Sequence, residues 1–127
     1  MSKYVLDASA ILALLNEEPG KKRVEAILPD SIISSVNYCE VLTKLSDSGI
    51  ADEESVDTFR LLGVSVISFD RETARIAARL RVKTKRLGLS LGDRSCLALG
   101  LVRRLPVVTA EHAWGKLKVG VKIEIVR

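Results

Sequence analysis

Cysteine and histidine are scarce in this chain, which has two cysteines and one histidine among 127 residues. Cys39 and Cys96 form no C-x-x-C pair, and both lie in segments patterned as buried helices. We predict two reduced core thiols, because a free cysteine behaves as a small hydrophobic residue. Without a cluster of cysteine and histidine, the sequence does not indicate a zinc site.

Long apolar runs and aromatic side chains are also lacking. The longest uncharged stretches, such as Ala8 to Asn16, are shorter than the roughly 20 apolar residues that a membrane span needs. Because the N-terminus moves directly into a strand pattern at Tyr4, we predict no targeting segment, no membrane partner and a cytoplasmic location. Aromatic residues make up 4% of the chain, too few for modules that stack nucleobases on aromatic side chains.

The composition indicates one domain that spans residues 1–127. A hydrophobic content of 47% is sufficient for one substantial core but hardly for two, and no internal repeat or low-complexity linker interrupts the chain. Lysine and arginine exceed aspartate and glutamate by 20 to 16, which gives a net charge of +4. This excess permits an anionic partner without requiring one.

Short apolar runs typical of strands alternate with amphipathic stretches. This alternation predicts an α/β fold with a parallel central sheet and helices on both faces. The strand order 3-2-1-4-5 would make strands 1 and 4 neighbours. Helix starts are predicted at Ser9, Ser35, Asp70 and Asp93, with Pro19-Gly20 closing the first helix. The predicted strands are Lys3 to Leu6, Ile32 to Ser34, Val64 to Phe69, Val107 to Thr109 and Lys122 to Val126.

Four separated acids, Asp7, Glu40, Asp93 and Glu111, are placed where such a sheet gathers side chains at one edge. In open α/β sheets, chemistry takes place beyond the carboxyl ends of the strands. Clustered carboxylates repel and raise one another's pKa unless a cation neutralises them. Hard oxygen ligands favour Mg²⁺ or Mn²⁺, so the sequence predicts a site for one or two such ions.

Each acid also has an ordinary structural alternative. Asp7 and Asp93 could cap helices, and Glu40 could form an exposed i,i+4 pair with Lys44. The combination favours the metal site, because a helix cap needs no partner acid.

The four acids lie in the segments Val5-Leu6-Asp7-Ala8-Ser9, Tyr38-Cys39-Glu40-Val41, Leu91-Gly92-Asp93-Arg94 and Val108-Thr109-Ala110-Glu111-His112-Ala113-Trp114. In this order and spacing, the segments resemble PIN-domain ribonucleases, most closely the VapC toxin type. The resemblance spans essentially the whole chain. It implies a three-layer α/β/α domain that cleaves RNA with Mg²⁺ or Mn²⁺, is usually neutralised by a cognate antitoxin and often forms a homodimer.

The resemblance also implies roles for individual residues. Asp7, Glu40 and Asp93 match the three principal acids, and Ser9 matches a small hydroxyl residue that supports the site. Glu111 departs from the family pattern, which usually has aspartate in a Thr-x-Asp motif. Asp7 and Asp93 would hold the first ion and Glu40 would support it or orient water. Glu111 with Asp93 would favour a second ion.

Side chains beside the acids have less specific roles. Ser9 and Thr109 could bond an acid or a backbone donor, with the cap role favoured for Ser9. His112 is not needed as a general base, and we predict that Trp114 packs a short helix against the core.

Basic residues follow one face of the predicted long helix. Arg75, Arg79, Lys83 and Arg86 have spacings of four, four and three residues, which places them on one stripe. The stripe could follow RNA phosphates beside the acidic site or could be an ordinary solvated helix face.

Two further functions stay open. A PIN fold that has weakened or lost catalysis could serve as an RNA- or protein-binding module, and Glu111 is the sequence feature that suggests it. A haloacid-dehalogenase-like phosphatase would also place an aspartate after strand 1. Such enzymes use Asp-x-Asp, however, and the second position here is Ser9.

Overall fold

The computed structural model describes residues 1–127, and a parallel sheet of five strands forms its centre. The sheet order is β3-β2-β1-β4-β5, as predicted, and every pairing is parallel. The carboxyl ends of all strands therefore lie at one edge of the sheet. The strands are β1 (Tyr4–Leu6), β2 (Ser31–Ser34), β3 (Ser65–Ile67), β4 (Val107–Thr109) and β5 (Ile123–Ile125).

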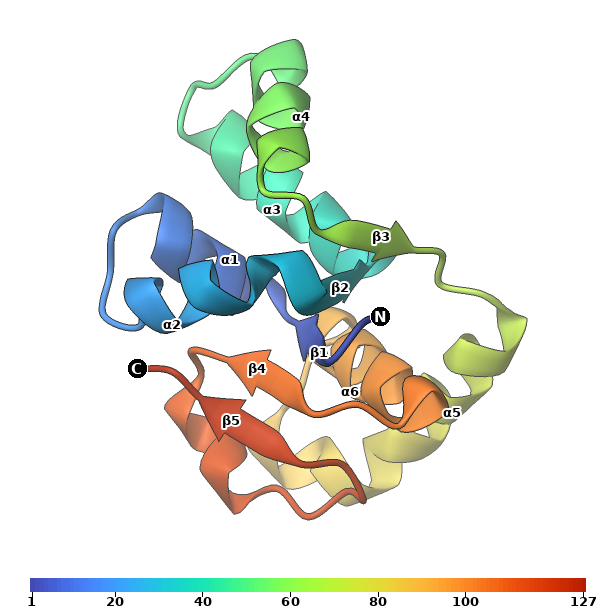
Figure 1. The fold of residues 1–127 in the computed structure, drawn as a ribbon. Helices are drawn as coiled ribbons and strands as arrows, with labels where there is room; N and C mark the ends of the chain where they lie inside the picture. The colour runs from blue at the N-terminus through green and yellow to red at the C-terminus, as the bar shows by residue number, and fades with distance from the viewer.

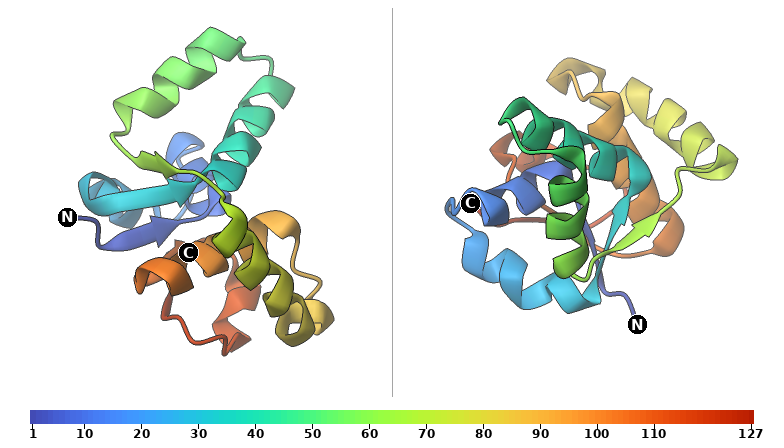
Figure 2. Two further views of the ribbon diagram at one scale, coloured as in Figure 1. Left: turned by 90° about the vertical axis from the view of Figure 1, so that its right-hand side faces the viewer. Right: turned by 90° about the horizontal axis from the view of Figure 1, so that it is seen from above.

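Helices cover both faces of the sheet and complete the three predicted layers (Figures 1 and 2). None of them combines the length and apolar character that crossing a membrane requires. The helices are α1 (Ala8–Leu15), α2 (Lys21–Ile27), α3 (Ser35–Asp47), α4 (Asp52–Leu61), α5 (Arg71–Thr84) and α6 (Leu91–Arg103), with 3-10 turns η1 (Leu28–Asp30), η2 (Lys85–Leu87) and η3 (His112–Lys116).

Two hydrophobic cores lie on opposite faces of the sheet, because successive side chains of a strand point to opposite sides. On β1, Val5 packs with residues of α5 and α6, whereas Leu6 packs with residues of α1, α2, α3 and α4. Trp114 of η3 is 2% exposed and joins the α5–α6 core, as predicted. Both faces of the central strands are therefore apolar and their sequences read as continuous buried runs.

Two helices begin at residues other than those predicted. Asp7, not Ser9, caps α1, and its side chain accepts a hydrogen bond from the Ala10 N–H. The helix follows β1 directly, so the residue that ends the strand has the extended backbone of an N-cap. Asp93 is the third residue of α6, whose N-cap is Ser90. The two residues exchange bonds in a capping box.

Other helix boundaries follow the same local chemistry. Asp70 caps α5, and α3 begins at Ser35, both as predicted, and the N-cap of α3 is Ser34. The first helix already ends at Leu15, and Gly20 lies in a left-handed conformation at the start of α2. The first helix is therefore shorter than predicted, and α2 begins directly after Pro19-Gly20.

The prediction of two core thiols is correct for Cys96 and wrong for Cys39, which is exposed. The inward face of α3 carries Asn37, Val41 and Leu45, spaced by four residues. Cys39 is two residues from Asn37, which turns its side chain about 200° around the helix toward solvent. Cys39 is thus a surface thiol.

Gly100 sets how closely α6 approaches β4. A Cβ atom added at Gly100 would lie 2.6 Å from Val107 Cγ2 and 3.2 Å from the Leu105 carbonyl oxygen. We expect Gly100→Ala to lower the free energy of unfolding by about 1–3 kcal/mol, because it overpacks a filled core. Denaturant unfolding measures this change, and a stability equal to that of the wild type would contradict the close contact.

Candidate metal centre

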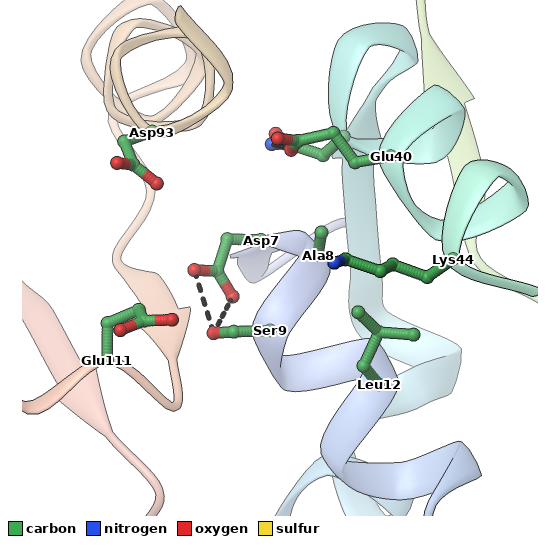
Figure 3. A pocket seen from close by; sticks show the side chains of 9 residues that line it. Asp7, Ala8, Ser9, Leu12, Glu40, Lys44, Asp93 and Glu111 are labelled. Atoms are coloured by element: carbon green, nitrogen blue, oxygen red, sulfur yellow. Dashed lines mark hydrogen bonds between the residues drawn. The ribbon is translucent and has the colours of Figure 1, made fainter. Parts of the chain in front are cut away.

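The four predicted acids line one pocket of about 160 Å³ at the carboxyl edge of the sheet. Figure 3 shows Asp7, Glu40, Asp93 and Glu111 directed toward a common space from separate elements of the fold. The nine lining residues include no histidine or cysteine, and the pocket's only basic side chain is Lys44. The full lining is Asp7, Ala8, Ser9, Leu12, Asn37, Glu40, Lys44, Asp93 and Glu111.

Asp7 is held rigidly at the base of the pocket between β1 and α1. Its side chain is 3% exposed, and its Oδ1 accepts from the Ala10 N–H at 2.9 Å. Thr109 Oγ1 donates to Oδ2 at 2.6 Å, and Ser9 Oγ lies 2.8 Å from Oδ1 (Figure 3). Asp7 therefore combines the helix-capping role with a place in the acidic pocket.

Ser9 and Thr109 tie the end of β4 to the start of α1. Ser9 Oγ accepts a hydrogen bond from the Ala110 N–H, and Thr109 Oγ1 accepts one from the Glu111 N–H. Both hydroxyls also bond Asp7, so the two alternatives predicted for them, an acid or a backbone donor, occur together. This network fixes the backbone that carries Glu111 next to Asp7.

Burial raises the pKa of Asp7 from 3.8 to about 6. The hydrogen bonds from Thr109, Ala10 and Ser9 act in the opposite direction, and the charge of Asp93 adds a further upward contribution. Desolvation dominates because a buried carboxylate loses water that three neutral donors only partly replace. A nearby cation would remove this penalty.

Glu40 and Asp93 enter the pocket from α3 and α6. Glu40 Oε1 accepts a hydrogen bond from Asn37 Nδ2 at 2.7 Å, and no ion pair joins Glu40 to Lys44. Asp93 Oδ2 accepts from the Ser90 N–H. The pKa of the buried Cys96 thiol is raised well above its ordinary value by burial and by Asp7, Asp93 and Glu40 together. The charges of these three acids therefore all reach the Cys96 thiol, which shows that the acids lie close to one another.

Glu111 is the most exposed of the four acids. It precedes η3, and its side chain caps no helix end. Its position at the end of β4 matches the prediction, and its carboxylate is directed toward the space beside Asp7 and Ser9 (Figure 3). Its carboxylate has no hydrogen bond or ion pair to another residue, so a move toward Asp93 would break no such bond.

The donor set fits Mg²⁺ or Mn²⁺. All four acidic groups are oxygen donors, and the buried Asp7 carboxylate has no ion-pair partner. As placed, no three acidic, histidine or cysteine side chains in the chain are close enough together to hold an ion by themselves. Mg²⁺ is usually bound by one or two carboxylates and keeps several waters, so an open pocket suits it.

The basic stripe does not enter the acidic pocket. Arg75, Arg79, Lys83 and Arg86 are exposed along α5 and η2, and none of them lines the pocket. Helix α5 packs on α6, the helix that carries Asp93. Contact of the stripe with RNA stays a prediction.

Sequence reasoning missed two residues of the site, Asn37 and Gly92. Asn37 is 1% exposed and bonds both Glu40 and the Gly92 carbonyl oxygen. The signal for Asn37 was its position three residues before Glu40, on the same side of one helix. Gly92 lies in one of the segments that resemble the family, but nothing in that segment indicates its contact with a side chain from another helix.

The fold and the pocket together define a class of protein, a parallel α/β domain with a carboxylate site at the carboxyl edge of its sheet. The chain belongs to the PIN domain family, whose model matches residues 4–119. The predicted family is therefore confirmed. Membership of the PIN domain family argues against the alternative of a haloacid-dehalogenase-like phosphatase.

Solved structures of toxin-antitoxin complexes contain chains with the same fold. One is a DNA-bound VapBC from Salmonella typhimurium, with 22% identity, a TM-score of 0.78 and 100% of each chain covered. VapBC2 from Rickettsia felis, bound to a promoter DNA fragment, has 17% identity, a TM-score of 0.76 and 98% coverage of each chain. VapBC-5 from Mycobacterium tuberculosis has 25% identity and a TM-score of 0.62, with 100% of this chain and 99% of that chain covered. The comparison with curated proteins finds no match.

Proposed function

We propose that this protein is a metal-dependent endoribonuclease and the toxin of a toxin-antitoxin pair. The observation that carries the proposal is the convergence of Asp7, Glu40, Asp93 and Glu111 on one pocket in a PIN domain. The likeness to chains of VapBC complexes supports the toxin role. The buried and unneutralised Asp7 supports a requirement for a divalent cation.

The proposal assigns each of the four acids a role according to its position in the pocket. Asp7 and Asp93 would hold one Mg²⁺ or Mn²⁺, Glu40 would support it or orient the attacking water, and Glu111 with Asp93 would favour a second ion. The bound ion would supply Lewis-acid activation of a phosphodiester and a lowered water pKa. Ser9 and Thr109 would keep the Asp7 carboxylate in one orientation.

The charge of the chain and its family support the proposed RNA and protein partners. RNA approaching an acidic pocket requires cations around it, and Arg75, Arg79, Lys83 and Arg86 on α5 and η2 are the proposed source. We propose an antitoxin with a basic residue that neutralises Asp7 and Asp93, and a homodimer as the resting assembly. If Asp7→Asn leaves inhibitor binding unchanged, blockade is steric and the neutralisation model is wrong.

The direct test is cleavage of labelled single-stranded RNA by the purified, partner-free protein. We expect cleavage with Mn²⁺ or Mg²⁺ and none with excess EDTA, because the acids alone cannot stabilise the charge that develops on the phosphate. RNA that is bound but left intact under all metal conditions would instead favour the alternative, a PIN-fold binding module with a weakened site. The exposed position of Glu111 is the observation behind that alternative.

A further inference from the structure

The carboxylate of Glu40 rests against bare backbone in the first turn of α6. A Cβ atom added at Gly92 would lie 2.5 Å from both Cδ and Oε1 of Glu40, and nearer still to Oε2. Real Cβ atoms do not approach other atoms so closely, so no other residue at position 92 leaves Glu40 where it is. The absence of a side chain at Gly92 is thus what admits Glu40 to this place.

Asn37 holds the same carboxylate from the other side. Its Nδ2 donates to Glu40 Oε1 at 2.7 Å and to the Gly92 carbonyl oxygen at 3.0 Å. These two acceptors fix the orientation of the amide, since only its nitrogen can donate to both. Glu40, Asn37 and Gly92 therefore form one connected unit that links α3 to α6.

Neither Gly92 nor Asn37 makes the fold more stable. A helix is less stable with glycine in its interior than with alanine, and the backbone at Gly92 is not in the left-handed conformation that would require glycine. Asn37 is buried with its Oδ1 unpaired, which also costs stability. Both unfavourable features occur at the two residues that surround the Glu40 carboxylate. Such local departures from good packing are expected where a site is being positioned.

We propose that Gly92 and Asn37 are positioning residues that form a cradle for the Glu40 carboxylate and thereby set the metal affinity of the pocket. This inference rests on the proposed function, because it assumes that Glu40 contributes to a divalent-metal site. The cradle places Glu40 beside the first turn of α6, where Asp93 also lies. The positive end of the helix dipole favours two carboxylates at that point.

The first test is Gly92→Ala, with Gly115→Ala as the matched control. At Gly115 an added Cβ would meet only Ile125 Cδ1, at 3.3 Å, and the residue lies outside the pocket. We expect Gly92→Ala to weaken Mn²⁺ binding about 10- to 100-fold, the range typical of residues that orient metal ligands. The atoms in the way are the end of a flexible side chain, so the thermal midpoint should not fall. Gly115→Ala should bind Mn²⁺ as the wild type does.

The second test separates positioning from a general effect on the pocket. Mn²⁺ affinity, measured by electron paramagnetic resonance titration, is compared in Glu40→Ala with and without Gly92→Ala or Asn37→Ala. If the cradle acts only through Glu40, adding either substitution to Glu40→Ala should change the affinity less than about twofold. Full additive losses in the Glu40→Ala background would overturn the proposal.

Failure of the cradle and failure of the proposed function give different results. Wild-type Mn²⁺ affinity in Gly92→Ala overturns the cradle, even if the wild type cleaves RNA. A wild type that binds Mn²⁺ but cleaves no RNA, together with weak binding in Gly92→Ala, overturns the nuclease and supports the cradle. No Mn²⁺ binding by the wild type, or equal binding by wild type and Glu40→Ala, contradicts the cradle as well.

Discussion

Asp7→Asn should make the metal-free protein more stable at pH 8, by up to about 3 kcal/mol. The wild-type folded state holds Asp7 as a buried carboxylate whose pKa is about 6, compared with 3.8 for the ordinary group. Asparagine has no charge to desolvate and is an equally good N-cap residue, so the helix start is preserved. The expected rise in the thermal midpoint is roughly 10 °C.

The raised pKa of Asp7 also predicts how the stability difference between Asp7→Asn and wild type changes with pH. Between pH 3.8 and about 6 the folded state holds a proton on Asp7 that the unfolded chain has lost. The contribution of this group to wild-type stability is therefore fully present below pH 3.8 and disappears as the pH rises through about 6. In EDTA, the stability difference between Asp7→Asn and wild type should be near zero at pH 4 and largest above pH 6. A difference that stayed constant from pH 4 to pH 8 would refute the raised pKa.

Mn²⁺ should remove most of this advantage by stabilising the wild type alone. At a free concentration of one hundred times the dissociation constant, an ion that binds only the folded state adds about 2.7 kcal/mol. Thermal unfolding at pH 7.5 should show this increase in wild type and little or none in Asp7→Asn. The increase should be smaller at pH 5, because a proton on Asp7 competes with the ion.

If Mn²⁺ raised the thermal midpoint of wild type and Asp7→Asn equally, the ion would bind at a site that does not include Asp7. Asp52→Asn, an exposed acid in the first turn of α4, is the matched control and should respond as the wild type does.

The sheet and the four acids at its edge were predictable from local signals combined with the order of the strands. Asp7 directly ends an apolar run, and a parallel sheet collects such positions at one edge. The order of the strands then places β1 beside β4, which brings Asp7 and Glu111 together. Glu40 lies in the second turn of α3, the helix that follows β2, and Asp93 lies in the first turn of α6 at the same edge.

The remaining features were hidden because they depend on contacts between distant residues. The effect of Gly92 depends on its contact with the Glu40 side chain, and the sequence of α6 does not indicate which residue of α3 approaches it. The exposure of Cys39 depends on which side of α3 faces the sheet, and the segment alone did not settle that orientation. The double role of Asp7, as cap and as pocket acid, could not be decided locally, since both roles use the same side chain.

The most direct measurement is RNA cleavage by wild type, Asp93→Asn and Asp52→Asn in the same Mn²⁺ buffer. The predicted result is cleavage by wild type and Asp52→Asn, with a loss on the order of 1,000-fold in Asp93→Asn, equivalent to about 4 kcal/mol of transition-state stabilisation. Each protein should also be unfolded thermally, to show that Asp93→Asn is folded at the assay temperature. Equal cleavage by a folded Asp93→Asn would contradict the carboxylate site.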